Sequence, residues 1–272
     1  MPSFSQAQKA EALLALHHGP KILVLPNAWD CASARLVERA GFPAIATSSA
    51  AIASSLGFAD GQNIPRQEML AVVKRIAACV ELPVTADLEA GYGNIMETAR
   101  ELAAAGAVGL NLEDIESGQP DLVDIPAQVE KIKTLRSASE TMGIRIFINA
   151  RTDVYLAQIG DPSSRFDRAC ERLKAYAEAG ADCLFIPGIK DEALIRAFVE
   201  ALKFPVNVLA VAGSPSIPRL QELGVARVSL GSGVARATLG LVDRILAELK
   251  QTGSYDAMTA GALPYAEVNA LF

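Results

Sequence analysis

One short pattern recurs along this chain. A helix-like segment ends at an alanine or leucine followed by a glycine, and an apolar strand-like run begins within about four residues. The pattern occurs at four glycines, Gly41, Gly106, Gly180 and Gly224. A glycine in this place commonly ends a helix, and connections of this length are typical of αβ loops. The repetition predicts a fold of alternating helices and strands.

The strand-like segments number eight and are continuous apolar runs, as expected for parallel strands covered by helices. They lie near Ile22, Ala44, Pro83, Gly109, Ile146, Cys183, Val206 and Arg227. Helical patterns precede, separate and follow them, at about 6–17, 30–40, 65–80, 95–105, 126–142, 163–179, 191–202, 216–223 and 233–249. This order predicts an α/β fold, a (β/α)8 TIM-type barrel with a C-terminal helical extension.

An open doubly wound sheet is the alternative, but no Gly-x-Gly-x-x-Gly follows the first strand. No linker or low-complexity stretch divides the chain, so we expect one barrel domain over residues 1–272. The tail keeps many apolar residues after Gly253. We therefore expect segment 250–272 to pack on the barrel or to be exchanged with a neighbouring subunit.

The composition excludes several classes of partner. With a net charge of −6, the chain offers no basic surface for nucleic acid or an anionic membrane. No apolar run approaches the roughly 20 residues of a membrane span. The four cysteines are scattered without a C-x-x-C motif, which predicts reduced thiols and a cytoplasmic location.

Polar residues gather where the predicted strands end, and in a barrel these ends form one active face. The first strand is followed by Asn27, Trp29 and Asp30, and the second by Thr47, Ser48, Ser49 and, later, Asp60. The third is followed by Asp87 and Glu89, the fourth by Glu113 and Asp114, and the fifth by Asn149, Arg151 and Asp153; the seventh carries Asn207.

Three acidic strand ends with one arginine would repel one another unless a cation binds. Oxygen ligands without a nearby histidine or cysteine favour Mg²⁺, or Mn²⁺, over zinc. Because Mg²⁺ keeps several waters, we expect Asp87 to bind it directly, and Glu89, Glu113 and Asp60 to act through water. Arg151 is expected to bind a substrate carboxylate, which the backbone N–H groups of Ser48, Ser49 and Ala50 would also receive.

Each of these residues also has a plainer interpretation. Asp87 and Glu113 could be helix caps or loop ends, and Arg151 could be a structural ion-pair partner of Asp153 or Glu113. Trp29 and Thr47 are expected to contact the substrate, although Trp29 could simply pack. Tyr92 is either a proton donor or a packed turn residue.

The two histidines, His17 and His18, lie in the N-terminal helix and are expected on its surface. A histidine base, a Ser-His-Asp triad and a zinc site are therefore not expected. A rival site is offered by Gly213-Ser214 and Gly231-Ser232-Gly233, which would suit a phosphate unless they are ordinary turns.

The motifs Asp87-Leu88-Glu89-Ala90-Gly91-Tyr92-Gly93, Leu112-Glu113-Asp114 and Asn149-Ala150-Arg151-Thr152-Asp153 occur in that order. Thr47-Ser48-Ser49 and Ser55-Leu56-Gly57 precede them, and together they resemble the isocitrate lyase/phosphoenolpyruvate mutase superfamily over about residues 25–240. The resemblance implies a (β/α)8 barrel, Mg²⁺, a small 2-oxo acid ligand, and a homodimer or homotetramer with an exchanged C-terminal helix. It also implies that Asn207 is an active-site asparagine.

Two departures from the family pattern occur, the first at a metal contact and the second in the loop that determines the reaction. Glu89 stands where the family usually has an aspartate. Residues 115–121 after Asp114 contain neither the Cys and His of the lyase loop nor the Lys and Asn of the mutase loop.

The prediction is a Mg²⁺-dependent carbon–carbon lyase that acts through a metal-stabilised enolate, resembling an oxaloacetate decarboxylase more than an isocitrate lyase. The alternatives are a phosphonopyruvate-type mutase or hydrolase, and a non-catalytic 2-oxo-acid-binding member of the fold.

Overall fold

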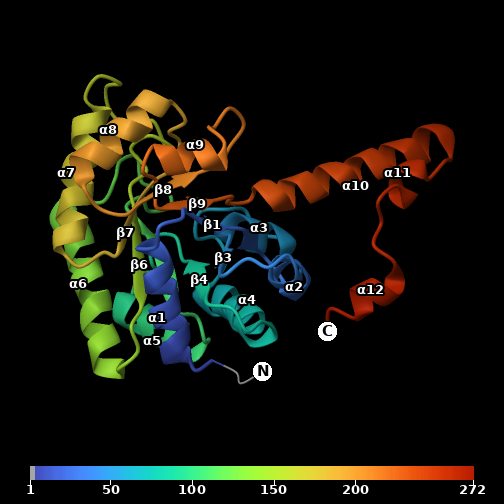
Figure 1. The fold of residues 1–272 in the computed structure, drawn as a ribbon, viewed down its shortest axis with the longest axis horizontal. Helices are drawn as coiled ribbons and strands as arrows, with labels where there is room; N and C mark the ends of the chain where they lie inside the picture. The colour runs from blue at the N-terminus through green and yellow to red at the C-terminus, as the bar shows by residue number, and fades with distance from the viewer. Residues whose placement is uncertain (1–3) are drawn as a thin grey trace.

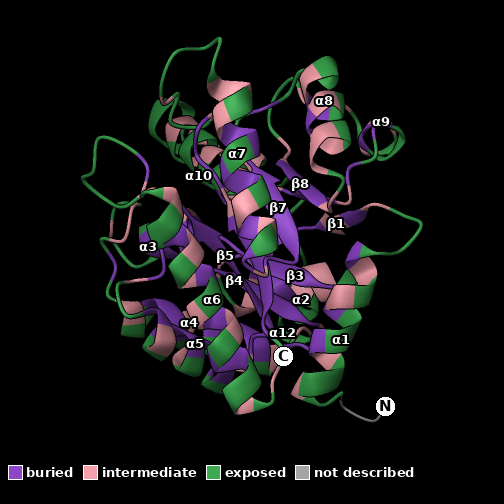
Figure 2. Cartoon of the chain, turned by 90° about the vertical axis from the view of Figure 1, so that its left-hand side faces the viewer, coloured by how far each residue is buried: buried purple, intermediate pink, exposed green. Residues whose placement is uncertain are grey.

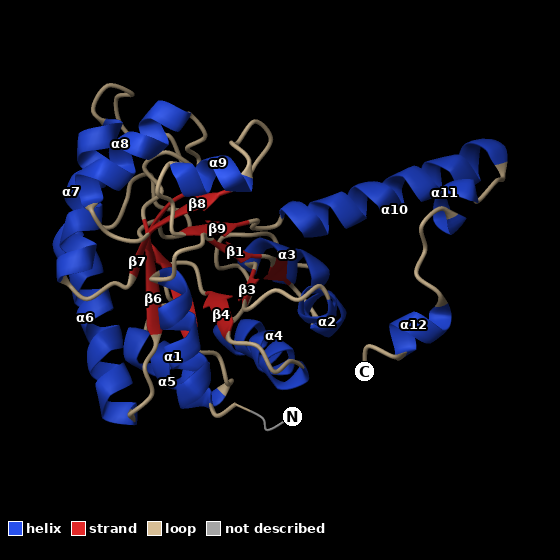
Figure 3. Cartoon of the chain, in the orientation of Figure 1, coloured by secondary structure: helices blue, strands red, loops and turns tan. Residues whose placement is uncertain are grey.

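The structure is a computed structural model that describes residues 4–272. Its centre is a sheet of nine parallel strands in the order β1-β9-β8-β7-β6-β5-β4-β3-β2, ringed by helices (Figures 1 and 3). The strands are β1 (Leu23–Leu25), β2 (Asn27–Ala28), β3 (Ile45–Thr47), β4 (Val84–Asp87), β5 (Gly109–Glu113), β6 (Phe147–Arg151), β7 (Cys183–Ile186), β8 (Val206–Leu209) and β9 (Arg227–Ser229).

Nine strands correspond to the eight predicted ones because the first is interrupted at Pro26. β1 pairs with β9, and β2, one residue further along the chain, pairs with β3. The two halves of this first strand therefore join the ends of the sheet, which makes a nearly closed barrel. The predicted (β/α)8 barrel is confirmed.

The helices follow the predicted alternation. They are α1 (Gln6–His17), α2 (Cys31–Arg39), α3 (Ser49–Ser55), α4 (Arg66–Cys79), α5 (Ile95–Ala104), α6 (Ile125–Met142), α7 (Arg165–Glu178), α8 (Glu192–Leu202), α9 (Ile217–Glu222), α10 (Gly233–Thr252), α11 (Asp256–Thr259) and α12 (Tyr265–Asn269). The four recurrent glycines all have positive φ, between 82° and 109°, as helix-ending glycines should. The predicted cap of α2 also forms, because the Asp30 carboxylate accepts the N–H of Ser33 at 2.7 Å.

The strands and the inner faces of the helices are buried, while the outer faces of the helices are exposed (Figure 2). At the N-terminal end of the barrel, Ala10 and Leu13 of α1 pack against inward residues such as Leu25 and Phe147. The expectation that His17, in the same helix, lies on the surface is wrong. His17 is only 4% exposed and stacks on Phe147, with ring centroids 4.0 Å apart.

The last three helices leave the barrel. α10 projects away from the barrel. α11 lies beside the far end of α10, and α12 lies below α10 in the view of Figure 1. Most of the apolar side chains of this arm, which we define as residues 233–272, are exposed, including Leu239, Leu246, Tyr265 and Phe272. Among residues 4–272, no helix is long and apolar enough to cross a bilayer.

Candidate active site

A polar cavity of about 130 Å³ opens at the carboxyl ends of the strands. Six residues of the predicted metal and carboxylate site line it, together with other residues, of which the sequence had indicated Asn27, Gly231 and Ser232 in other contexts. The predicted ones are Ser48, Ser49, Ala50, Asp60, Asp87 and Arg151; the others include Asn27, Asn111, Leu156, Phe185, Leu209, Ser229, Gly231 and Ser232. The charged side chains of the lining are two carboxylates and one guanidinium, so the centre is acidic before any ligand binds.

Asp87 is held from three sides at the end of β4. Its Oδ2 accepts the backbone N–H of Ser49 at 3.2 Å and the Ser49 hydroxyl at 2.8 Å. Its Oδ1 accepts Nδ2 of Asn111 at 3.2 Å, and its own N–H donates to Oγ1 of Thr47 at 2.9 Å. Thr47 thus fixes the backbone of Asp87 and does not itself line the cavity. The carboxylate is fixed in position, and each of its oxygens has a protein donor.

Glu89 has a different environment, although it lies only two residues further along. Its φ of +50° is rare for a residue other than glycine and turns the side chain toward the loop after α3. There Oε1 accepts the N–H groups of Gly61, at 3.0 Å, and Gln62, at 2.7 Å, while the Tyr92 hydroxyl donates to Oε2. Glu89 therefore anchors the loop that carries Asp60 into the cavity. Neither Glu89 nor Tyr92 is part of the cavity lining.

Burial shifts the pKa values of this pair. It raises the pKa of Glu89, against the opposing effect of the hydrogen bond from Tyr92. It also raises the pKa of Tyr92, and the nearby Glu89 carboxylate raises it further. Tyr92 therefore remains protonated as the donor to Glu89.

Arg151 at the end of β6 bridges two acids. Its Nε and Nη2 donate to the two oxygens of Asp153, at 2.7 and 2.9 Å, and its Nη1 lies 2.7 Å from Oε2 of Glu113. Its Cζ also lies 5.7 Å from the centre of the Phe185 ring. Both of the ion pairs that were weighed as the structural alternative for Arg151 therefore form, and the same guanidinium still lines the cavity.

Burial and the ion pairs determine the ionisation of Glu113, Arg151 and Asp153. Burial raises the pKa of Glu113 well above its usual value, and Arg151 opposes that shift. Burial alone would lower the pKa of Arg151, but Glu113 and Asp153 raise it. Arg151 is consequently a permanent cation. Asp153 is oriented in turn by Asp114, whose Oδ1 accepts the Asp153 N–H at 2.9 Å.

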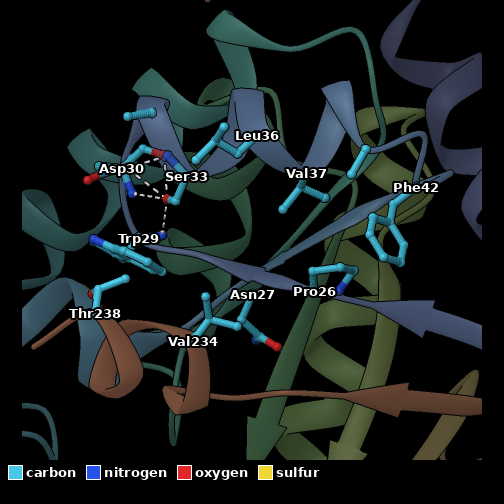
Figure 4. Close-up of a pocket in the computed structure, with 12 residues that line it drawn as sticks. Pro26, Asn27, Trp29, Asp30, Ser33, Leu36, Val37, Phe42, Val234 and Thr238 are labelled. Atoms are coloured by element: carbon cyan, nitrogen blue, oxygen red, sulfur yellow. Dashed lines mark hydrogen bonds between the residues drawn. The ribbon is translucent and has the colours of Figure 1, made fainter. Parts of the chain in front are cut away.

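Two predicted residues lie apart from this group. Trp29 lines a second, apolar cavity of about 350 Å³ between α2 and the start of α10, where it lies near Thr238 (Figure 4). Asn207 is fully buried inside the barrel, where its Oδ1 accepts the Ser229 hydroxyl at 3.4 Å. Of the rival phosphate residues, Gly231 and Ser232 line the polar cavity, whereas Gly213, Ser214 and Gly233 do not.

The donor set suits a hard divalent cation. Asp87 and Asp60 line the same cavity, and oxygen is their only ligand atom. In the described part of the chain, no three His, Cys, Asp or Glu side chains converge into a preformed metal cage. This arrangement fits Mg²⁺ or Mn²⁺, because Mg²⁺ is commonly bound by one or two carboxylates and keeps waters in its other positions.

Comparison with known proteins identifies the family of the chain. The family model described as phosphoenolpyruvate phosphomutase matches residues 13–250. The chain belongs to the isocitrate lyase/phosphoenolpyruvate mutase superfamily. Within this superfamily, it is 30% identical to a 2-methylisocitrate lyase of Bacillus subtilis over 92% of this chain and 84% of that protein. It is 31% identical to an oxaloacetate decarboxylase of Rhodopseudomonas palustris over 93% and 89%, respectively.

A solved structure from Burkholderia cenocepacia J2315, provisionally described as a lyase or mutase, is 40% identical with a TM-score of 0.90. The match covers 97% of this chain and 95% of that one. The chain is thus an enzyme of a superfamily of lyases and mutases.

Proposed function

We propose that this enzyme is a divalent-metal-dependent carbon–carbon lyase, and that its substrate is a small 2-oxo diacid which it decarboxylates as oxaloacetate is decarboxylated. The observation that carries the proposal is the single cavity in which Asp87, Asp60 and Arg151 face the same small volume. The similarity to an oxaloacetate decarboxylase and to a 2-methylisocitrate lyase supports the same reaction class.

In this proposal Asp87 and Asp60 hold Mg²⁺ or Mn²⁺, Asp87 directly. The bound ion would stabilise the negative charge that develops on the 2-oxo oxygen when a bond at C3 breaks. Glu89 and Glu113 were predicted as further contacts through water. Their present partners give Glu89 the role of holding the Asp60 loop and give Glu113 the role of pairing with Arg151.

Arg151 and the Ser48–Ala50 turn are proposed to bind a substrate carboxylate. In the turn, the Ser48 and Ser49 N–H groups donate to the Ala28 carbonyl and to Asp87, so Ala50 would supply the backbone donor. Asp153 and Glu113 hold the guanidinium in a fixed orientation, so little side-chain entropy is lost when a carboxylate binds to its remaining N–H groups. Trp29 and Asn207 were predicted to contact the substrate, but they lie outside the cavity lining and are not part of this proposal.

The loop after Asp114 favours decarboxylation over retro-aldol cleavage. None of residues 115–125 lines the cavity, and two acids of this loop pair with helix residues instead, Glu116 with Lys131 and Asp121 with Arg168. Retro-aldol cleavage of a 2-hydroxy acid needs a base for the hydroxyl proton and an acid for the new carbanion. Decarboxylation of a 2-oxo diacid releases CO₂ and needs only a proton at C3, so it requires less from this loop.

A phosphonopyruvate-type mutase or hydrolase is the second candidate. The observation in its favour is that Gly231 and Ser232, just before α10, line the cavity, where small residues at a helix start suit a phosphonate. Turnover distinguishes the two candidates.

The test is a panel of oxaloacetate, isocitrate, 2-methylisocitrate and phosphonopyruvate, each assayed with Mg²⁺ and with EDTA. We expect oxaloacetate to give pyruvate and CO₂ only with Mg²⁺. Turnover that is equally fast in EDTA would overturn the metal-dependent mechanism. Turnover of phosphonopyruvate alone would replace the lyase by the mutase or hydrolase.

We also propose that the enzyme is a homodimer or homotetramer and that residues 250–272 take part in exchange between subunits. The exposed apolar side chains of the arm support this, because they would be covered by a second copy. The cytoplasmic location stays part of the proposal.

A further inference from the structure

A charged side chain crosses the interior of the barrel beneath the proposed metal site. Arg227 of β9 is 0% exposed, and its Nη2 donates to Oδ1 of Asn111 at 3.3 Å. In the strand order, β9 and β5 lie on opposite sides of the barrel. The guanidinium therefore reaches across the barrel to a residue that lines the polar cavity.

Asn111 in turn contacts Asp87. The register pairs Asp87 with Asn111 and Asn111 with Asn149, so these three side chains lie next to one another on the inner face of β4, β5 and β6. Nδ2 of Asn149 donates to Oδ1 of Asn111 at 2.8 Å, and Nδ2 of Asn111 donates to Oδ1 of Asp87 at 3.2 Å.

These bonds fix the orientation of a carboxamide. Its oxygen receives two donors, from Arg227 and Asn149, so its NH₂ group must face Asp87. If the carboxamide turned over, its oxygen would face the Asp87 carboxylate and its NH₂ group would face two donors. Both contacts would be unfavourable.

In the described part of the chain, the Arg227 side chain makes no other hydrogen bond. Its Nε and Nη1 are buried and without a hydrogen-bond partner. Burial lowers its pKa to about 10, with Cys183 and Asp87 as the acidic groups that oppose the shift. It therefore remains a cation near neutral pH, and burying a cation that lacks a paired carboxylate costs stability.

We infer that Arg227 is a positioning residue, which locks the Asn111 carboxamide so that Asn111 in turn holds the Asp87 carboxylate in its metal-binding orientation. This inference rests on the proposed metal site. It assigns functions to two residues, Arg227 and Asn111, to which the proposed function gives no role in binding metal or substrate.

The alternative is that Arg227 acts through its charge alone. The two explanations predict opposite changes in the affinity for a divalent cation when Arg227 is replaced. Loss of a nearby positive charge should strengthen the binding of a divalent cation at Asp87. Loss of positioning should weaken it, since changes to residues behind a metal ligand typically cost tenfold to a hundredfold in affinity.

The experiment is a double-mutant cycle on Mn²⁺ affinity, measured by electron paramagnetic resonance without any organic acid. The variants are Arg227→Met, Asn111→Leu and the double variant, with thermal unfolding followed for each. We expect each single change to weaken Mn²⁺ binding by about tenfold or more, and the double variant to bind as Asn111→Leu does. Arg227→Lys, which keeps a cationic donor, should stay within about threefold of the wild type.

The outcomes separate the two levels of the proposal. A wild type that binds no Mn²⁺ would overturn the proposed metal site, and with it this inference. A wild type that binds Mn²⁺, with tighter or unchanged binding in Arg227→Met, would overturn the positioning role alone, as would additive losses in the double variant. If Arg227→Met does not fold, Asn111→Leu remains decisive, because unchanged Mn²⁺ affinity in that variant would contradict the inference.

Discussion

Asp87 and Glu89 are separated by one residue and act on different parts of the site. Asp87 continues the inward alternation of β4 and faces the cavity. Glu89 has left-handed backbone and faces the loop after α3 instead. Two carboxylates that look equivalent in sequence are thereby divided into a proposed metal ligand and a loop anchor.

His17 shows at the same scale what burial does to an ionisable group. Burial, together with the nearby positive charge of Arg227, lowers its pKa from 6.5 to about 3. The unfolded chain therefore binds a proton first as the pH falls. The stability associated with neutral His17 is present above about pH 6.5 and is lost progressively toward pH 3.

The substitution His17→Phe tests this and keeps a ring to stack on Phe147. Between pH 6.5 and 5, we expect the unfolding free energy of the wild type to fall by about 2 kcal/mol more than that of the variant, since one pH unit corresponds to about 1.4 kcal/mol. Urea unfolding at a series of pH values measures the difference. His18→Phe, at an exposed neighbouring position, should keep the pH dependence of the wild type. Parallel curves for wild type and His17→Phe would refute the account.

Some residues of the candidate site could be predicted from the sequence and others could not. Asp87 and Arg151 were predicted because polar residues directly after apolar runs mark strand ends. Asn111 was missed because β5 was treated as a continuous apolar run, although Asn111 alternates with Glu113 and so shares its face. Arg227 could not be assigned, because its partner lies 116 positions away across the barrel.

At the scale of elements, the segment between α3 and α4 depends on one carboxylate. Glu89 accepts two of its backbone N–H groups, and the Gln62 side chain accepts the N–H of Tyr92 at 3.1 Å. This loop and the turn after β4 therefore support each other. The position of Asp60 at the cavity follows from that contact.

Replacing Glu89 by Ala should release this loop. We expect hydrogen exchange at the Gly61 and Gln62 amides to accelerate by about tenfold or more, because both lose their acceptor and open locally. Exchange measured by mass spectrometry on peptides covering residues 57–64 reports the change. Glu97→Ala removes a half-exposed carboxylate that pairs with Arg66, and it should leave this loop unchanged. Equal protection in Glu89→Ala and wild type would contradict the anchor role.

At the scale of the whole molecule, the barrel encloses its own core while the arm leaves an apolar surface uncovered. Leu239 and Leu246 of α10 are 58% and 59% exposed. The apolar cavity beside Trp29 lies where this helix departs from the barrel (Figure 4). A second copy would cover such surfaces, and this favours the proposed oligomer.

The double change Leu239→Glu with Leu246→Glu should therefore lower the mass of the particle in solution. We expect a dimer or tetramer for the wild type and a monomer for the variant, measured by sedimentation or light scattering at micromolar concentration. Leu56→Glu, at a comparably exposed leucine on the barrel, serves as the control. A monomeric wild type, or an unchanged mass in the variant, would refute the role of the arm.

The barrel could be predicted at this scale because its repeat is local, with each helix, glycine and strand adjacent in sequence. The direction in which the arm leaves the barrel could not be predicted from the sequence. The sequence shows that residues 250–272 include many apolar side chains, but the partner of such a segment is decided by which surfaces are left open after folding. Trp29 illustrates the same limit, since only the fold places it outside the polar cavity.

Asp87 is the residue through which metal and 2-oxo acid are proposed to bind together. Calorimetry of pyruvate binding, with and without Mg²⁺, tests this in wild type, in Asp87→Ala and in Asp121→Asn, an exposed acid outside the cavity. We predict Mg²⁺-dependent binding in wild type and Asp121→Asn, and none in Asp87→Ala. Binding that persists unchanged in Asp87→Ala, or that does not require Mg²⁺ in the wild type, would contradict the account.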